Sequence, residues 1–547
     1  MKSFLKLSFL SVIIFLFSSC GKNNEAGKMI PSDALFVTHV NIKSMHDKLS
    51  WNEIKRTSWY QKVYSDSSSS DWRRKILDNP SASGIDFDEG LTFFVAKNSG
   101  NEYLAAEGKL KSEKDFEQFN KNFDPSQTPK KEGSINVLIL KNNHVVGWND
   151  DHFIYVMTSG RPSHMYESAD SNDIQNETTA VDRSAALSSI CKNLFSLKAD
   201  SSLSQNDHFA SLLKENGDMQ IWQNTEAIIK SSSSLGMLGM LKLDAFTKDN
   251  ASAYNINFNK GMIDIDQKTY ASKELTDIVK KYMGNSVDMD MVKNIPSQNL
   301  FGLLAFNFKP EGITELIKLT GADGIANSYA QQLGFNLDDF SKATDGNWLL
   351  AFTDLKMNPD SAKMNPVAFN YIFSAGVGDK ASLQKIVTAA EKTTAQMGKD
   401  SVINYVMNDK TFVISNDRSF ANQYLNGNNN KFDFNDKISG HPVGFFLDLH
   451  KILTEFSNLK KNDERKEMLN TALNTWNNVI ASGGEFKDDG FTFHAAINLI
   501  NKDTNSLIQL NNYLDQMYKI NESRKDASTA KLDSLLVPPP IDTVKVK

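Results

Sequence analysis

Histidines and paired carboxylates are the residues of this chain whose types and spacing could support chemistry. His144 with His152, and His441 with His450, are close enough in sequence to meet across neighbouring strands. A zinc site needs three or four ligands, and neither pair is joined by a cysteine or recurs at matched positions. Ordinary surface or core histidines are therefore the favoured interpretation.

Two acidic pairs are further candidates. Asp86 and Asp88 lie in the segment GIDFDE, which suggests calcium, but this segment lacks the ligand spacing of a calcium-binding loop. Asp264 and Asp266 alternate along an expected strand, so both carboxylates lie on one face. That arrangement suits a solvated sheet better than the carboxylate pair of a glycosidase. We interpret both pairs as structural.

Cofactor signals are equally sparse. Gly376, Gly378 and Ala381 fit a loose dinucleotide-binding pattern between a strand and a helix, but the corresponding turn near Gly108 has a single glycine. The sequence contains no G-x-S-x-G, H-E-x-x-H or phosphate-loop motif. We predict no catalytic, cofactor-binding or metal-binding residue, and we favour a protein that is not an enzyme.

The amino terminus carries the one strong chemical signal. Lys2 and Lys6 precede an apolar segment, residues 7–17, that is too short to span a membrane. Two serines and Cys20 follow directly, an arrangement that resembles the lipobox of bacterial lipoprotein signal peptides. The alternative is an ordinary signal peptide with an incidental cysteine.

Lipidation of Cys20 would make residues 1–19 a signal peptide and residues 20–28 a polar tether. Acyl chains such as palmitate contribute about 0.8 kcal/mol per buried methylene, enough for several chains to hold a soluble domain on a membrane. We expect an outer-membrane lipoprotein, with the periplasmic and surface faces both open. Only Glu25 is acidic among residues 21–28, which follow the cysteine, so a surface-export signal is weak.

Composition argues against a nucleic-acid partner. Without Lys2 and Lys6 the chain has 58 basic and 66 acidic residues, a net charge of −8, and only eight of its 60 basic residues are arginine. A nucleic-acid-binding protein would need a basic stripe. Cys191 is the only cysteine besides Cys20, and its helical apolar surroundings predict a buried small side chain rather than a disulfide.

The chain repeats itself. Residues 30–36, IPSDALF, match residues 295–301, IPSQNLF, at five of seven positions, and GIDFDE at 84–89 matches GFNLDD at 334–339. Two expected hairpins, 135–148 and 402–415, are each followed by the same spacing: Asn149, Asp150 and Phe153 in the first case, and Asn416, Asp417 and Phe420 in the second. Internal repeats outrank local propensity, so we predict two copies of one module.

These elements predict an α+β fold of two tandem modules with mainly antiparallel sheets and packed helices. The first module spans residues 29–284, with an insertion at about 165–207 that holds the Cys191 helix, and the second spans 285–520. Residues 45–64 are expected to form a helix whose aromatic residues serve as core or as a sugar platform. Residues 521–547, with three prolines, are expected to be a disordered tail or a peptide that docks on a partner.

The lipobox, the opening I-P-S-x-x-L-F and the repeat together resemble an uncharacterised lipoprotein family of Bacteroidota, a domain of unknown function. That resemblance covers residues 25–520 and implies no activity. One hypothesis is a non-catalytic envelope lipoprotein that binds a partner protein or ligand, or scaffolds a complex at the outer membrane; the alternative is an envelope hydrolase acting on glycan or peptide. A cleft between the modules lined by buried, hydrogen-bonded carboxylates or histidines would favour the hydrolase, and a broad exposed apolar patch would favour the binding protein.

Overall fold

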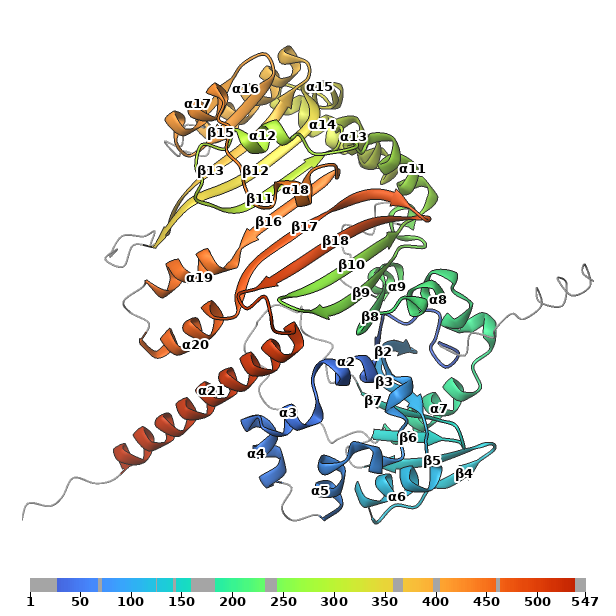
Figure 1. The fold of residues 1–547 in the computed structure, drawn as a ribbon. Helices are drawn as coiled ribbons and strands as arrows, with labels where there is room; N and C mark the ends of the chain where they lie inside the picture. Colours follow the sequence, from blue (N-terminus) through green and yellow to red (C-terminus); the bar gives the residue numbers. More distant parts are fainter. Residues whose placement is uncertain are drawn as a thin grey trace, which may run out of the picture.

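The computed structural model describes residues 27–66, 71–123, 125–140, 144–158, 183–231, 244–357, 367–396, 404–458 and 463–536. The fold is α+β, as predicted, with helices packed on one continuous sheet of 18 strands. Every strand pairing in this sheet is antiparallel, and the sheet runs through the whole molecule (Figure 1). We call residues 29–284 the first half and residues 285–536 the second half.

The strands of the first half are β1 (Phe36–Val40), β2 (Leu91–Asn98), β3 (Asn101–Lys109), β4 (Lys130–Glu132), β5 (Ile135–Leu140), β6 (His144–Trp148), β7 (His152–Thr158), β8 (Met219–Asn224), β9 (Ala251–Asn259) and β10 (Met262–Tyr270). Its α-helices are α2 (Ile42–Lys48), α3 (Trp51–Lys55), α4 (Ser58–Asp66), α5 (Asp71–Asp78), α6 (Glu113–Phe123), α7 (Ser184–Phe195), α8 (Asp207–Lys214), α9 (Thr225–Ser231), α10 (Asp244–Thr247) and α11 (Lys273–Tyr282). Short 3-10 helices are η1 (Pro80–Ser83), η2 (Phe87–Glu89), η4 (Ala199–Ser201) and η5 (Leu203–Gln205).

The strands of the second half are β11 (Leu300–Asn307), β12 (Thr344–Met357), β13 (Val367–Val377), β14 (Tyr405–Met407), β15 (Thr411–Ser415), β16 (Val443–Asp448), β17 (Trp476–Lys487) and β18 (Gly490–Leu499). Its helices are α12 (Met289–Lys293), α13 (Pro310–Leu319), α14 (Asp323–Leu333), α15 (Leu337–Ala343), α16 (Lys380–Gln396), α17 (Arg418–Asn426), α18 (Asn435–Ile438), α19 (Leu449–Ser457), α20 (Asp463–Leu473) and α21 (Ser506–Leu536).

The strands of the two halves follow the same spatial order in the sheet. In the first half, neighbouring strands run β7-β3-β2-β1-β8-β9-β10. In the second half they run β15-β13-β12-β11-β16-β17-β18. The last strands of the two series, β10 and β18, pair with each other and join the halves at a seam. The strand that follows each I-P-S segment is thus the fourth in its series.

The repeated I-P-S segments are anchored by their isoleucines. Ile30 and Ile295 are almost completely buried, each in the main core of its half. A β-bulge between Leu300 and Gly302 sets Phe301 out of register in the second half. The bulge adds one residue to the offset between the halves, so His39 of β1 corresponds by pairing to Ala305 of β11.

The predicted equivalence of hairpins 135–148 and 402–415 is wrong. In the second half, β15 pairs directly with β13, whereas β6 in the first half pairs with β5 and β7; it is β7 that pairs with β3. Hairpin β14–β15 therefore matches hairpin β6–β7. The sequence match between Asn149 and Asn416 aligned a hairpin turn with a helix cap. The error arose because the same side-chain types serve in both structures.

Strand pairing shows which turns correspond. Asn149 Oδ1 accepts the backbone N–H groups of Asp151 and His152 at 3.0 and 2.7 Å. Asn408 Oδ1 accepts those of Lys410 and Thr411 at 2.9 and 2.8 Å. The first turn precedes β7, which pairs with β3, and the second precedes β15, which pairs with β13. Asn149 therefore corresponds to Asn408.

The Cys191 helix is not an extra element of the first half, contrary to the predicted insertion at 165–207. Helix α7 packs on β6 and β7, and α17 packs in the same way on β14 and β15. Residues 165–182 of the predicted insertion lie outside the described residues. The two helices begin with similar residues, RSAA at 183–186 and RSFA at 418–421, but the match at Asn149 and Asn416 had already aligned this part of the second half with a different turn.

Two further expectations need correction. Residues 45–64 form three short helices, α2, α3 and α4, because Ser50 starts α3 with a capping box to Glu53 and breaks the run. Residues 521–536 are not a disordered tail but the end of α21, which projects from the body in Figure 1. The prolines at 538–540 lie outside the described residues.

The main cores of both halves lie on the same face of the sheet. The first gathers residues such as Val37, Phe94 and Cys191, and the second gathers Leu303, Leu349 and Phe446. On the opposite face at the seam, Leu507 of α21 packs against Phe258 and Ile263. The core face at the seam is thus left to polar side chains from both halves. None of the described helices is both long and apolar enough to cross a membrane.

Candidate functional site

A pocket of about 230 Å³ lies at the seam and draws its lining from both halves. We call it the seam pocket. Leu212 and Phe493 supply its apolar wall. Its ionisable lining residues are Glu215, Asp266 and Lys268 from the first half and His441, Glu485 and His494 from the second.

Alternation along β10 places the acidic residues of this pocket. Asp264, Asp266 and Lys268 occupy every second position, so they share one face of the strand. Across the seam, Asp266 lies directly opposite His494 of β18. Asp266 Oδ1 is 2.9 Å from His494 Nδ1, and Asp264 Oδ1 is 3.8 Å from Nε2 of the same ring. One imidazole is therefore held between two carboxylates and ties the halves together.

A second imidazole–carboxylate pair faces the same pocket. His441 Nδ1, from the segment before β16, lies 2.5 Å from Glu485 Oε1 on β17. A β-bulge between Gly483 and Glu485 turns this carboxylate toward the histidine. Gly483 has a φ of +152°, and a Cβ there would come within 2.4 Å of the Thr492 carbonyl oxygen, so only glycine fits the bulge.

The two candidate histidine pairs do not meet, in keeping with the favoured interpretation of ordinary histidines. His144 and His152 begin two antiparallel strands, β6 and β7, and therefore lie at opposite ends of that pairing. His441 and His450 flank the full length of β16. Sequence analysis placed Asp264 and Asp266 correctly on one face but missed their partner His494, because its position 228 residues away becomes adjacent only through strand pairing.

A row of polar residues crosses eight neighbouring strands and passes through the seam pocket. Each residue lies directly opposite the next across one strand pairing, so all eight share the core face. In spatial order the row is Glu107 (β3), Thr92 (β2), His39 (β1), Gln220 (β8), Asn255 (β9), Asp266 (β10), His494 (β18) and Ser482 (β17). We call it the polar row.

The polar row is buried at its first-half end. Glu107 is only 8% exposed, and among the described residues its Oε2 atom has no hydrogen-bond partner. Burial alone raises the pKa of Glu107 to about 7. Burial also lowers the pKa of His39, whose Nδ1 is hydrogen-bonded to Thr92 Oγ1 at 3.0 Å. An uncharged, partly buried histidine and a buried carboxyl that binds a proton readily therefore lie in the same row.

Gln220 links the polar row to the helix that walls the seam pocket. Its Nε2 donates to the carbonyl oxygens of Leu212 and Glu215, at 3.0 and 2.5 Å, where α8 ends. The side chain satisfies carbonyl groups that the helix leaves without partners. The Asn255 Oδ1 atom, next in the row, is buried without a partner in the described part of the chain.

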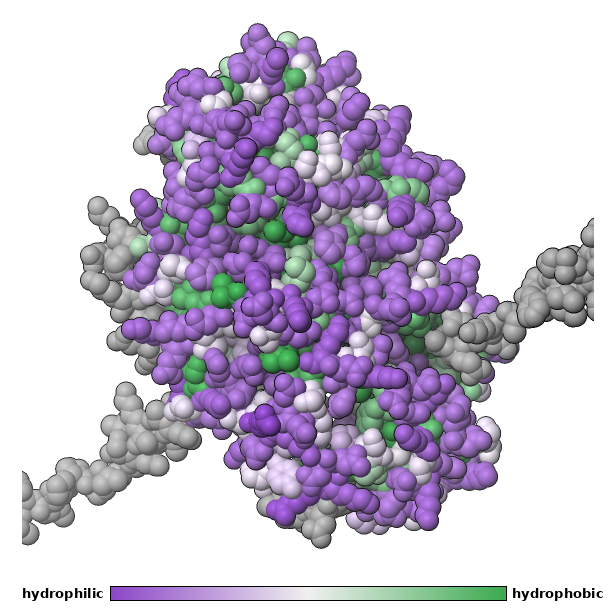
Figure 2. Space-filling view, viewed as in Figure 1, coloured by the Kyte–Doolittle hydropathy of each residue, from purple (hydrophilic) through white to green (hydrophobic). Residues whose placement is uncertain are grey.

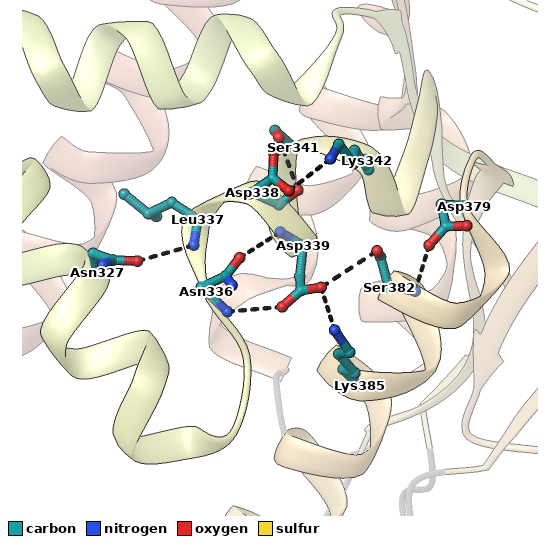
Figure 3. A network of polar contacts seen from close by, with 10 residues as sticks. All are labelled: Asn327, Asn336, Leu337, Asp338, Asp339, Ser341, Lys342, Asp379, Ser382 and Lys385. Atoms are coloured by element: carbon teal, nitrogen blue, oxygen red, sulfur yellow. Dashed lines mark hydrogen bonds and ion pairs between the residues drawn. The ribbon is translucent and has the colours of Figure 1, made fainter.

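The GIDFDE and GFNLDD segments are structural turns, as predicted. Asp86 Oδ1 accepts the Asp88 N–H at 3.1 Å, and Asn336 begins α15 with a capping box to Asp339. Figure 3 shows the Asp339 carboxylate reaching α16, where Lys385 Nζ donates at 2.6 Å and Ser382 at 3.4 Å. The hydrogen bond from Lys385 holds the pKa of Asp339 below its usual range. This carboxylate is therefore committed to joining two helices.

The loose dinucleotide pattern has no room for a phosphate. A Cβ at Gly376 would lie 2.1 Å from Asp345 Oδ1, so a carboxylate already fills the space beside the turn. Within the described ranges, no three His, Cys, Asp or Glu side chains come together in a way that could hold a metal ion. Cys191 is buried, as predicted, and burial raises the pKa of its thiol to about 12. Cys20 lies outside the described residues.

A shallower pocket of about 460 Å³ lies at the far end of β12 and β13. Asp354, Lys356, Phe369 and Tyr371 contribute to its lining. Asn416, singled out by the sequence repeat, donates to the Phe369 carbonyl oxygen at 2.7 Å and accepts the Tyr371 N–H at 3.1 Å. Asn416 therefore holds the end of β13.

Comparison with known proteins gives a family and no activity. A family model described as a domain of unknown function, DUF4836, matches residues 27–436. The chain belongs to this family. The matched range includes the whole first half and the second half as far as α18. A search of curated proteins finds no match.

Among solved structures, one titled "Structure of crystal form III of TP0453" is 8% identical to this chain, with a TM-score of 0.24. The alignment covers 47% of this chain and 85% of that chain.

Proposed function

We propose that this protein is a non-catalytic cell-envelope lipoprotein of Bacteroidota type, anchored at the outer membrane by lipid on Cys20. Its role is to bind a ligand or an envelope partner protein, and the seam pocket is its binding site. The observation that carries the proposal is the pocket itself, which both halves must form together. The lipobox-like residues up to Cys20 support the anchor.

The pairing of charged groups in the seam pocket supports binding over catalysis. Each histidine is already fixed through Nδ1 by a carboxylate, and His494 Nε2 faces the second carboxylate, Asp264. These side chains are also well exposed, with 52% of His494 and 59% of Asp266 accessible. Exposed, mutually paired groups are weak general acids or bases, because catalysis needs a pKa adjusted by burial or by an unpaired neighbour.

We also propose that the halves arose by duplication of one module. The matched strand order, the two I-P-S segments and the two Asn-capped hairpin turns support this. Two backbone contacts also correspond: Asn41 N–H donates to the Asp218 carbonyl at 3.0 Å, and Asn307 N–H donates to the Pro442 carbonyl at 2.9 Å. Duplication explains why the seam joins the same strand of each half.

Crosslinking in native membranes tests the binding role. The double variant His441→Gln, Glu485→Gln removes one imidazole–carboxylate pair from the seam pocket without emptying a core site. The matched control Asp409→Asn removes an exposed ion pair with Lys380, 2.7 Å long, far along the second half. We expect the pocket variant to lose a crosslinked partner that wild type and control retain. Equal capture by all three would contradict the assignment of the site.

The anchor has its own test. We expect Cys20→Ala to move the protein from the membrane fraction to the soluble fraction, because the described helices offer no spanning segment. Recovery of this variant in membranes after a carbonate wash would contradict the lipid anchor.

An envelope hydrolase is the second candidate, and one observation favours it. Ser482, His494 and Asp266 lie opposite one another on three adjacent strands, which is the residue set of a serine hydrolase. However, no hydrogen bond joins Ser482 to His494 in the described residues, and a nucleophile and its base should lie about 2.6–3.2 Å apart. The apolar residues on the face in Figure 2 lie in separate small patches, so this view does not show the broad exposed apolar patch that would favour a binding protein.

A serine-reactive fluorophosphonate probe distinguishes the two functions. The binding proposal predicts that wild type and Ser482→Ala are labelled equally weakly. Labelling of wild type that disappears in Ser482→Ala would establish the hydrolase instead.

A further inference from the structure

Glu107 is a buried carboxyl group that does not line the seam pocket. It points to the core face of β3, where Tyr103 and Ala105 precede it on the same side of the strand. The surrounding core cluster is apolar. One carboxyl oxygen, Oε2, has no partner in the described part of the chain. A carboxylate without a partner in such a place costs several kcal/mol, so the group stays neutral when it can.

The groups that face Glu107 offer it no positive charge. Thr92 lies opposite on β2 and Ile154 lies opposite on β7. Beyond Thr92 is His39, which burial keeps uncharged, and burial is also the sole cause of the shift at Glu107. Loss of the proton would therefore leave an uncompensated negative charge in the core of the first half.

The buried carboxyl lies next to the contact between α7 and the sheet. Cys191 of α7 packs over Ile154, with its Sγ 4.0 Å from the Ile154 carbonyl oxygen. One strand further, a Cβ at Gly147 would lie 2.5 Å from the same sulfur, so α7 sits close against β6. Glu107, Ile154 and Gly147 are consecutive cross-strand neighbours. Water can reach the buried Oε2 atom of Glu107 only if packing in this region opens.

We propose that Glu107 is a proton-dependent latch, which holds α7 on the sheet while the carboxyl is protonated and releases it when the proton leaves. The ligand of this site is the proton itself. The proposal is independent of the seam pocket and of any partner. It makes the first half responsive to acidity, whereas the second half has the neutral Ser374 at the corresponding position.

The direction of the response follows from linkage. The pKa of Glu107 is raised from 4.5 to about 7 in the folded state. The protonated group therefore supports the closed state fully below pH 4.5, and this support is lost as the pH rises toward 7. Between these values each pH unit should favour opening by about tenfold, and above pH 7 the effect should level off.

Thiol labelling of Cys191 measures the opening. Its rate in the full-length protein, solubilised in detergent, is followed by mass spectrometry of the Cys191 peptide and divided by the rate in denatured protein at the same pH. This ratio removes the intrinsic pH dependence of the thiol. We expect the protection of Cys191 to fall at least tenfold between pH 5 and pH 7.5 in wild type and to stay constant in Glu107→Gln.

Two controls keep the outcome interpretable. Glu102→Gln removes a half-exposed glutamate, paired with Lys97, from the same strand and should behave as wild type. If Glu107→Gln does not fold, the pH dependence of Cys191 protection in Glu107→Met and in wild type still tests the latch. Protection that is constant with pH in wild type, or that falls equally in wild type and Glu107→Gln, would overturn the latch.

Discussion

The two halves place different chemistry on the same backbone row. In the first half the row reads Glu107, Thr92, His39, Gln220, Asn255 and Asp266; in the second, at the corresponding strands, it reads Ser374, Leu349, Ala305, Gly444, Ser482 and His494. At the first four positions the first half thus has polar or ionisable groups where the second has a serine and three small or apolar residues; the last two positions, at the seam, are polar in both halves. The two halves therefore share a strand order but differ in the side chains that this order brings together.

The largest expected effect tests whether the halves are built alike. Phe153 on β7 packs with Phe116 of α6, and Phe412 on β15 packs with Leu383 of α16. Both are buried, so each alanine variant should lose about 3–5 kcal/mol of unfolding free energy. The exposed Phe36 provides the control, with a loss below about 1 kcal/mol. Denaturant melts that separate Phe153→Ala and Phe412→Ala by several kcal/mol would break the comparison.

A buried ion pair found only in the first half gives the next effect. Asp218 has 1% of its side chain exposed, and its carboxylate accepts from Ser44 Oγ at 2.6 Å, Lys48 Nζ at 2.5 Å and Phe258 N at 2.6 Å. Asp218→Ala should therefore cost about 3 kcal/mol, since Lys48 and the Phe258 N–H lose their acceptor. The corresponding residue in the second half is Pro442, which has no such network. Thermal melting of Asp218→Ala within 1 °C of wild type would contradict this account.

Glu107→Gln should stabilise rather than destabilise. Because the folded pKa of Glu107 is about 7 against 4.5 ordinarily, wild type loses stability between these pH values. At pH 7.5 the glutamine variant should be more stable by about 2–3 kcal/mol, and at pH 4 the two should be equal. Melting temperatures at the two pH values check the sign. A variant less stable than wild type at pH 7.5 would show that Glu107 has an unseen cationic partner.

The smallest effect distinguishes two aspartates that the sequence treated as equivalent. Asp417 Oδ1 caps α17 by accepting the Ser419 and Phe420 N–H groups at 2.7 and 3.1 Å, so Asp417→Ala should cost about 1 kcal/mol. In the first-half turn the N–H groups are accepted by Asn149, so Asp150→Ala should cost almost nothing. Equal losses in chemical denaturation would restore the equivalence.

Sequence analysis could match segments of the two halves because the I-P-S segments and the N-capped turns use residue types with narrow structural roles. It misaligned the hairpins because Asn and Asp cap both turns and helices, and only strand pairing separates Asn408 from Asn416. It also ended α21 too early, because the segment after residue 520 is polar. That segment contains no helix-breaking residue before the prolines, so the helix continues.

The site was harder to foresee because it depends on long-range pairing. Nothing local in the sequence brings His494 to Asp266 or Glu485 to His441. Glu107 left a faint signal: Tyr103, Ala105 and Glu107 alternate on the buried side of an expected strand, which puts a charge where an apolar residue belongs. Such a violation of the pattern is expected at functional or strained positions.

Amide hydrogen exchange of the wild-type protein tests the difference between the halves most directly. Protection is measured for the core strands β3 and β7 and for their counterparts β13 and β15 at pH 5 and pH 7.5, and each rate is corrected for intrinsic exchange. Our account predicts that β3 and β7 lose at least tenfold in protection at the higher pH, while β13 and β15 change little. Equal changes in the two pairs of strands, or none in either, would contradict it.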